Sequence, residues 1–310
     1  MSDHIKHECG IALIHLKHPI SYYTKKYGSS LYGIDKMFLM MEKQKNRGQD
    51  GAGYASIKFD LSPGQKYLYR VRSYNSQAIH DVFKKINKKI FQFYDSNKSL
   101  NKNSKAFYSG VPFIGQVMLG HVRYGTYGKN SIDYVQPVMR QNNWMHRNLI
   151  LAGNFNMSNN DELFESLVKL GQHPKERSDT ITIMEKIGHF LDYEVSQIYD
   201  KLKDGGYTKE EMPPLIEDKL DIVKILKKSS KNWDGGYTIA GMLGHGDSFI
   251  LRDPSGIRPA YYMENDEVVV VASERPAIQT VFNVSYQKIK EIPRGNALII
   301  NKKGKISLKE

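Results

Sequence analysis

The pattern of hydrophobic and polar positions along the first part of the chain predicts several strands and one helix. A short apolar run at residues 11–16 is typical of a buried strand, and apolar residues at helical spacing predict an amphipathic helix over residues 33–45. Residues 54–59 and 67–72 predict two further strands. The glycine-rich run "NRGQDGAG" at residues 46–53 predicts a loop between the helix and these strands.

The middle of the chain combines strands, helices and two polar segments. "NLILAGN" at residues 148–154 predicts a strand, and Ser158 with Asp161 predicts a helix cap after it. The two polar segments are interpreted as insertions. The first, residues 74–110, carries a short helix near residues 79–92, and the second, residues 191–230, is mostly helical.

From Gly236 onward the pattern changes to short strands separated by turn residues, with one short helix near residues 274–281. Strands early, helices in the middle and strands late predict a layered α+β fold with largely antiparallel sheets.

Composition narrows the class of protein. The 310 residues are 40% hydrophobic and 25% charged, as in ordinary globular chains, and no apolar run approaches the roughly 20 residues of a membrane helix. The start has no apolar signal segment, and a single cysteine fits a reducing compartment, so we expect a cytoplasmic protein. The net charge of +12 comes from scattered residues without a nucleic-acid-binding motif, so no nucleic-acid or membrane partner is expected.

The one cysteine, Cys9, stands at the start of the first predicted strand. A lone buried cysteine is often simply a small apolar side chain. Because Cys9 is close to His4 and His7 in the sequence, a metal site is a second interpretation, although these spacings match no zinc pattern. The third interpretation is a nucleophile: if residues 1–8 were removed, Cys9 would carry an α-amine that could act as its base.

Three further segments carry side chains that suit a binding site. In "GHVRYGTYG", Arg123 is suited to a carboxylate, and Tyr124 and Thr126 follow it in a glycine-rich turn. In "AGNFN", the amide of Asn154 and the next backbone N–H could stabilise an oxyanion, although a plain polar turn is the simpler interpretation. In "SDT", Asp179 is either a helix cap or a partner for an ammonium group.

Together these motifs resemble the class II glutamine amidotransferases, whose glutaminase domain is an N-terminal nucleophile hydrolase. The markers "CGIAL", "NRGQDGAG", "GHVRYGT", "AGNFN", "SDT", "RDPSGIRPAYY" and "ASE" occur in this order from Cys9 to about Gly295. Within the class, the chain looks most like the glutaminase half of the amidophosphoribosyltransferase family, which acts in purine synthesis. The resemblance implies a four-layer αββα sandwich of two mostly antiparallel sheets.

The resemblance also implies roles for particular residues. Cys9 matches the nucleophile, residues 1–8 a removable propeptide, and residues 9–310 the glutaminase domain. Asn154 and the N–H of Phe155 match the oxyanion donors. The remaining residues match the glutamine pocket: Arg123 for the α-carboxylate, Asp179 for the α-amine, Thr126 and Tyr124 in the glutamine loop, and Arg47 beside Cys9.

The sequence departs from the family in two places. The family usually has glycine where Phe155 stands, and a positive φ would be costly for phenylalanine. The usual histidine before Arg-Gly is Asn46.

Proteins of this family have a second half that binds phosphoribosyl pyrophosphate. The motifs of that half have no counterpart in this sequence. The resemblance therefore implies L-glutamine as substrate and a phosphoribosyltransferase domain or partner as the acceptor of ammonia, with self-association left open. It implies no cofactor or metal in this domain, since Mg²⁺ would belong to the other half. Two alternatives remain: a glutaminase serving hexosamine or asparagine synthesis, and an uncleaved non-catalytic homologue.

Overall fold

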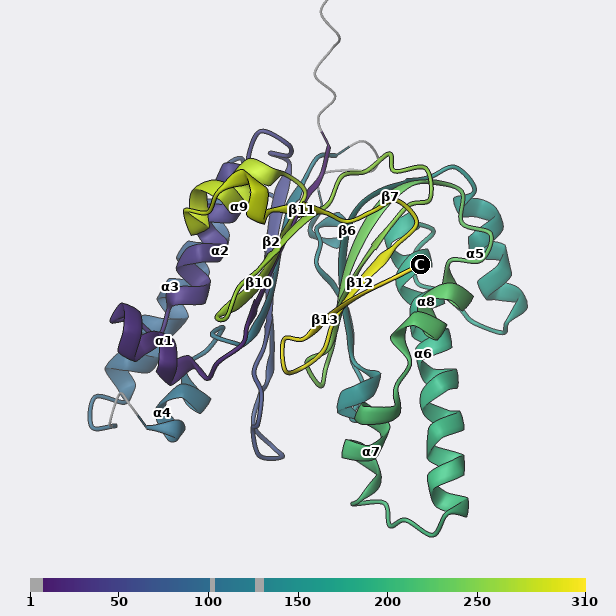
Figure 1. Ribbon diagram of the computed structural model, residues 1–310, viewed down its shortest axis with the longest axis horizontal. Helices are drawn as coiled ribbons and strands as arrows, with labels where there is room; N and C mark the ends of the chain where they lie inside the picture. The colour runs from purple at the N-terminus through teal and green to yellow at the C-terminus, as the bar shows by residue number, and fades with distance from the viewer. Residues whose placement is uncertain (1–7, 101–103, 126–130) are drawn as a thin grey trace, which may run out of the picture. The chain divides into compact units, whose positions relative to one another are not determined.

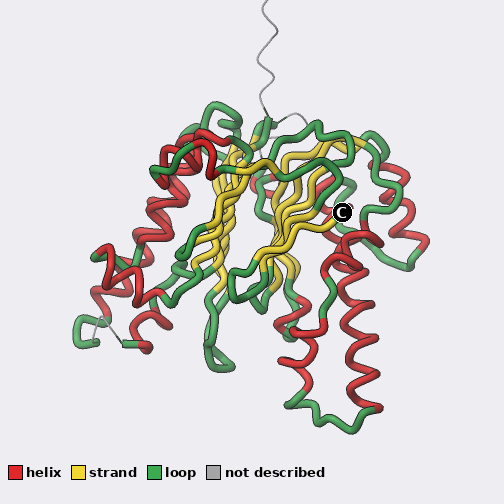
Figure 2. Tube along the Cα trace, in the orientation of Figure 1, coloured by secondary structure: helices red, strands yellow, loops and turns green. Residues whose placement is uncertain are grey.

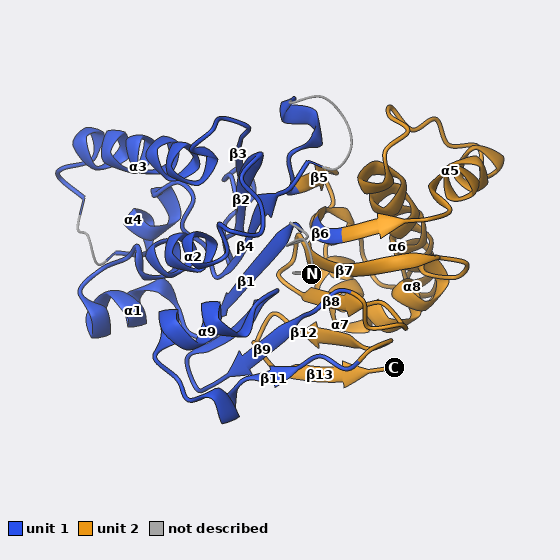
Figure 3. Ribbon diagram, turned by 90° about the horizontal axis from the view of Figure 1, so that it is seen from above, with its two compact units in different colours: residues 1–137, 152–154, 258–293 blue, residues 138–151, 155–257, 294–310 orange. Residues whose placement is uncertain are grey.

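The computed structural model describes residues 8–100, 104–125 and 131–310. The chain divides into two compact units (Figure 3). Unit 1 comprises residues 1–137, 152–154 and 258–293, and unit 2 comprises residues 138–151, 155–257 and 294–310. Each unit has its own sheet and its own helices, and each is described by itself.

Unit 1 is built on a seven-stranded sheet in the order β11-β9-β10-β1-β4-β2-β3, in which neighbouring strands run antiparallel. The central strand β1 is buried along its whole length, because apolar side chains cover both faces of a strand inside a sheet. The strands are β1 Gly10–Leu16, β2 Gly51–Ile57, β3 Leu68–Ser73, β4 Val117–Arg123, β9 Tyr261–Glu264, β10 Val268–Ala272 and β11 Lys290–Glu291.

Helices cover one face of this sheet (Figure 1). Helix α2 approaches β4 so closely that a Cβ on Gly120 would lie 2.6 Å from the sulfur of Met37. A larger residue at this position would force the buried methionines of α2 to shift, so glycine allows the helix to lie close to the strand. The helices of unit 1 are α1 Ile20–Tyr27, α2 Tyr32–Lys43, α3 Ala78–Ser96, α4 Lys105–Gly110 and α9 Arg275–Phe282, with short 3₁₀ turns at Ile132–Tyr134 and Tyr286–Lys288.

Unit 2 is built around a six-stranded sheet in the order β13-β12-β8-β7-β6-β5. Residues 152–154 of β6 belong to unit 1, so this strand passes through both units. Figure 2 shows the strands and the helices that follow them along the chain. The elements are β5 Val138–Arg140, β6 Leu149–Met157, β7 Gly235–Leu243, β8 Ser248–Arg252, β12 Ala297–Ile300, β13 Ile306–Lys309, α5 Asn160–Lys169, α6 Asp179–Asp204, α7 Met212–Lys219, α8 Ile222–Ser229 and a 3₁₀ turn at Met145–Arg147.

The predicted α+β class is confirmed, since each unit supplies one largely antiparallel sheet and a set of helices. These are the components of a four-layer sandwich. Three details of the prediction were wrong. The loop at residues 46–53 ends early, because β2 already begins at Gly51. Asn159 rather than Ser158 precedes α5, and the Ser158 hydroxyl donates to Asp234 at 2.5 Å instead.

The third correction concerns the helix predicted near residues 79–92 in the polar segment 74–110. This helix, α3, is longer than predicted, and it buries one apolar side against β2 and β3. The many lysines of α3 occupy its outer side, so composition alone concealed an amphipathic helix. The segment 191–230 is mostly helical, as predicted. Whether either segment is an insertion relative to other proteins stays a prediction.

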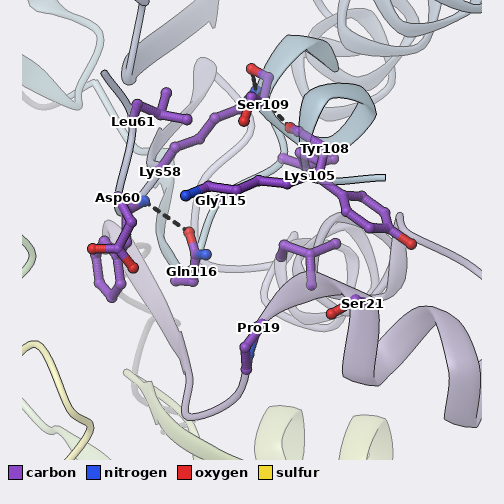
Figure 4. A pocket seen from close by; sticks show the side chains of 13 residues that line it. Pro19, Ser21, Lys58, Asp60, Leu61, Lys105, Tyr108, Ser109, Gly115 and Gln116 are labelled. Carbon is purple, nitrogen blue, oxygen red and sulfur yellow. Dashed lines mark hydrogen bonds between the residues drawn. The ribbon is translucent and has the colours of Figure 1, made fainter. Parts of the chain in front are cut away.

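A buried lysine ties α4 to the sheet of unit 1. The Lys58 side chain lies just after β2, is 5% exposed, and its Nζ donates to the carbonyls of Tyr108, Ser109 and Val111 (Figure 4). Burial lowers the pKa of Lys58 from 10.5 to about 7. Lys58 also lines a cavity of about 440 Å³, whose wall contains none of the predicted site residues.

Replacing Lys58 tests the hydrogen bonds between its side chain and the end of α4. Above about pH 10.5, where the lysine is neutral in both states, Lys58→Met should lower the free energy of unfolding by about 1–3 kcal/mol, because three carbonyls at the end of α4 lose their donor. In the parent, the free energy of unfolding should also rise as pH rises from about 7 to 10.5, because the unfolded chain holds the lysine proton more firmly than the folded chain. The variant should lack this rise. Urea unfolding at several pH values measures both effects. The exposed Lys105→Met, from the same cavity wall, is the control, and equal behaviour of the two variants would contradict the prediction.

Candidate functional site

The thiol of Cys9 lies at the beginning of β1, beside the end of β4. The Cys9 side chain is half-buried, and its Sγ accepts from the N–H of Tyr124 at 3.4 Å and lies 3.6 Å from the carbonyl oxygen of the same residue. Strands β1 and β4 are paired, with Gly10 opposite Val122, so the sheet register brings Cys9 and Tyr124 together. Two of the predicted site residues thus meet through backbone pairing.

Arg47 fixes the chain on both sides of Cys9. It follows α2, and its Nε donates to the carbonyl of Cys9 at 3.1 Å. Its Nη1 donates to Glu274 at 3.3 Å, at the start of α9, and its Nη2 donates to Glu8 at 2.9 Å. The Arg47 carbonyl accepts from the N–H of Glu8 at 3.0 Å. A planar guanidinium with several donors suits this role, because it can hold several oxygens in fixed directions.

Asn154 lies near the end of β6 and is 3% exposed. Its Nδ2 donates to the carboxylate of Glu8 at 3.1 Å. The preceding Gly153 is held at both of its polar atoms: its N–H donates to Gln136 at 2.6 Å, and its carbonyl lies 3.2 Å from Nε2 of His121. Burial lowers the pKa of His121 to about 3, so the ring is neutral and donates through Nε2. These contacts fix the backbone that presents the Asn154 amide.

Arg123 ends β4 directly before Tyr124. Its side chain is 5% exposed, and its guanidinium carbon lies 5.9 Å from the centre of the Tyr134 ring. The turn after it is held by Asp50, whose N–H donates to the Arg123 carbonyl at 2.9 Å and whose carboxylate accepts from Gly125 at 2.8 Å. Thr126, predicted in the same loop, lies outside the described residues.

Asp179 and Phe155 belong to unit 2. Asp179 is the first residue of α6, but the cap is Ser178, whose hydroxyl accepts from Ile181. The capping interpretation of Asp179 was therefore wrong by one position. Burial raises the pKa of Asp179. This effect is larger than that of the hydrogen bonds from Thr180, which favour the charged carboxylate and lower the pKa.

Phe155 continues β6 immediately after Asn154. Among the residues that the structure describes, positive φ values at non-glycine residues occur at Asp60, Phe113, Asn232 and Asn283, and Phe155 is not one of them. Its strand conformation therefore carries no left-handed strain. The ring of Phe155 packs against the apolar core of unit 2.

Within unit 1 the structure brings together Cys9, Arg47, Tyr124 and Asn154, while Arg123 is next to Tyr124 in the chain. Three acidic and basic residues of this cluster were not predicted: Glu8, Arg258 and Glu274. Arg258 and Glu274 lie in the markers "RDPSGIRP" and "ASE", so a signal for them was present. Glu8 was counted only as part of the leader.

Across residues 8–100, 104–125 and 131–310, no three His, Cys, Asp or Glu side chains are grouped so that they could hold a metal ion. His4 and His7, which raised the metal alternative, lie outside these ranges. Over the same residues, no helix has the length and apolar character needed to cross a membrane.

Comparison with known proteins shows what the chain is similar to. No protein-family model matches the chain. An amidophosphoribosyltransferase from Pasteurella multocida is 25% identical over 304 residues, which cover 96% of this chain and 47% of that protein. Another from Bacillus subtilis is 29% identical over 192 residues, or 61% of this chain and 33% of that protein. The chain thus spans less than half the length of these curated relatives.

Two solved structures share the fold. The B. subtilis glutamine phosphoribosylpyrophosphate amidotransferase complexed with ADP and GMP is 22% identical, and a structure titled as the allosteric regulatory enzyme of purine biosynthesis is 24% identical. Each matches with a TM-score of 0.59 over 97% of this chain and 49% of its own.

The fold is like that of glutamine amidotransferases, and the sequence similarity supports a glutamine amidotransferase-like domain, as the sequence motifs predicted. The particular proteins it is similar to are amidophosphoribosyltransferases, enzymes of the predicted class, and the similarity extends along nearly the whole chain. The roles of the individual site residues stay predictions.

Asp179 gives a prediction that concerns unit 2 alone. Because burial raises the pKa of its carboxyl group in the folded state, the unfolded chain releases this proton first as pH rises from about 4. Stability should therefore fall through this interval in the parent, and Asp179→Asn should lack that fall. Urea unfolding from acid to neutral pH measures the difference. Parallel curves for parent and variant would show that Asp179 is not buried as described.

Proposed function

We propose that this chain hydrolyses the side-chain amide of L-glutamine to glutamate and ammonia, with Cys9 as nucleophile. The observation that carries the proposal is the position of the only cysteine. Cys9 directly precedes the central strand β1. Arg47 and Tyr124 contact Cys9, and Asn154 contacts the neighbouring Glu8, all within one unit. Motif order and similarity to amidophosphoribosyltransferases support the same reaction.

The reaction requires removal of residues 1–8, so that Cys9 has a free α-amine. This amine takes the thiol proton, directly or through one water, as Sγ adds to the amide carbon of glutamine. The Asn154 amide and the N–H of Phe155 stabilise the oxyanion. The C–N bond then breaks, the amine returns the proton, and ammonia leaves. Water hydrolyses the remaining γ-glutamyl thioester, which gives glutamate and restores the thiol.

The two charged ends of glutamine have separate partners in this proposal. The Arg123 guanidinium holds the α-carboxylate, because two parallel N–H donors match two carboxylate oxygens. The Asp179 carboxylate holds the α-ammonium group. Tyr124 and Thr126 complete the glutamine loop, and Arg47 keeps the Cys9 carbonyl in place.

The ammonia would serve 5-phosphoribosylamine formation in purine synthesis, and its acceptor would be a phosphoribosyltransferase domain or partner. The names of the relatives support this acceptor over hexosamine or asparagine synthesis. The glutaminase steps use a thiol, an amine and amide groups, so we propose no cofactor for this domain and assign Mg²⁺ to the phosphoribosyltransferase part. A single thiol used as a nucleophile is suited to the reducing cytoplasm.

Two substitutions test the chemistry in chains that begin at residue 9, made by site-specific proteolysis of a fusion. Cys9→Ala should abolish ammonia release, because no other thiol is present in the chain. Asn154→Ala should lower kcat by about 10² to 10³, because one oxyanion donor is lost. Glutamate and ammonia formation from glutamine provide the measurement. Asn75→Ala is the control, since that exposed amide also donates to a carboxylate, Asp81, at 3.3 Å. Full activity of Asn154→Ala would remove it from the mechanism.

The N-terminus separates the enzyme from a non-catalytic homologue. Purified active protein should have the mass of a chain that begins at Cys9, and a reactive glutamine analogue should label that residue covalently. An extension that cannot be removed should abolish turnover, because the amine then remains an amide. Protein that retains Met1, releases no ammonia and resists labelling would favour the non-catalytic alternative.

A further inference from the structure

The carboxylate of Glu8, the residue directly before Cys9, is held by three side chains. Its Oε2 accepts from Arg47 at 2.9 Å and from Asn154 at 3.1 Å, and its Oε1 accepts from Nη1 of Arg258. All of these residues belong to unit 1. The side chains of Glu8, Arg47 and Arg258 are 24%, 12% and 18% exposed, so the ion pairs are largely shielded from water.

The backbone around Glu8 is fixed as well. Its N–H donates to the Arg47 carbonyl at 3.0 Å, and the next carbonyl, that of Cys9, accepts from Arg47 Nε at 3.1 Å. The Cys9 thiol is held by the N–H of Tyr124. The peptide bond between Glu8 and Cys9 therefore has anchored groups on both sides.

A leader that is only removed would not need this many contacts to Glu8. Charge-assisted bonds to arginine are among the stronger hydrogen bonds in proteins, and a side chain with three donors loses most of its freedom. A peptide held in one geometry next to a nucleophile reacts faster than a mobile one, because the entropy of orientation has already been lost. The contacts of Glu8 thus hold the Glu8–Cys9 peptide bond in one geometry, as cleavage of that bond requires.

We propose that Glu8 is a positioning residue for the removal of its own leader. The step is hydrolysis: water is added across the Glu8–Cys9 peptide bond, which leaves a carboxylate on Glu8 and the free α-amine on Cys9. Before cleavage, the Asn154 amide donates to the Glu8 carboxylate, and this hydrogen bond prevents the same amide from donating to glutamine. This inference rests on the proposed function, because leader removal matters only if Cys9 is the nucleophile.

The test compares the rate of leader loss among full-length variants. Intact mass is followed after a pulse of expression in the same host. Glu8→Gln keeps the shape of the side chain but loses both ion pairs, and it should slow cleavage at least about tenfold, because the peptide bond loses part of its fixed orientation. Glu8→Asp keeps the charge and should recover part of the rate. Glu264→Gln, which removes an ion pair to Lys17 elsewhere in unit 1, should have no effect.

A second set of proteins separates positioning from folding. In the Cys9→Ala background, which we expect to keep the leader because the neighbouring thiol is absent, the Glu8→Gln precursor should unfold at nearly the same temperature as its parent. A slow cleavage rate together with an unchanged midpoint supports positioning. Equal cleavage of Glu8→Gln and parent, retention of the leader by the parent, or a slow rate explained by a lower midpoint would each overturn the proposal.

The outcome is distinguishable from failure of the proposed function. The leader is absent from the mature chain, so slowly cleaved Glu8→Gln yields a product identical to the parent. A chain that begins at Cys9, made by site-specific proteolysis of a fusion, is assayed for ammonia release from glutamine. If this chain is inactive, the glutaminase proposal fails, whereas the cleavage rates still decide the role of Glu8.

Discussion

The arrangement around the thiol depends on one guanidinium group, that of Arg47. It binds the Cys9 carbonyl and the carboxylates of Glu8 and Glu274, so the end of α2, the start of β1 and the start of α9 are joined at one point. A lysine could not replace it, because an ammonium group lacks the planar set of donors that reaches three oxygens in different directions. The position of α2 therefore determines where the Cys9 thiol lies.

That position is itself set by packing inside unit 1. Gly120 allows the methionines of α2 to contact β4, and β4 in turn pairs with β1 and ends at Arg123 and Tyr124. Neutral His121, on the same strand, supports the backbone before Asn154. One strand thus supplies the packing surface, the contact to the thiol and the support for the amide.

The sequence was sufficient for the α+β class, for most strands, and for the grouping of Cys9, Arg47 and Tyr124, because periodicity and ordered motifs are local signals. It was insufficient for α3, where surface lysines obscured an apolar side, and for β13, whose few residues are mostly exposed. The ion pairs of Glu8 with Arg258 join residues 250 positions apart. Sheet pairing, which no local pattern encodes, creates such contacts.

The solitary thiol has a consequence for oxidation. Cys9 is half-exposed, whereas Met37, Met40 and Met41 beneath β4 are fully buried, so oxidants reach the cysteine before these thioethers. Within this chain there is no second cysteine to convert a sulfenic acid into an intramolecular disulfide. Recovery of an oxidised Cys9 would then depend on a thiol from outside the chain, such as a small-molecule reductant, and further oxidation would be irreversible.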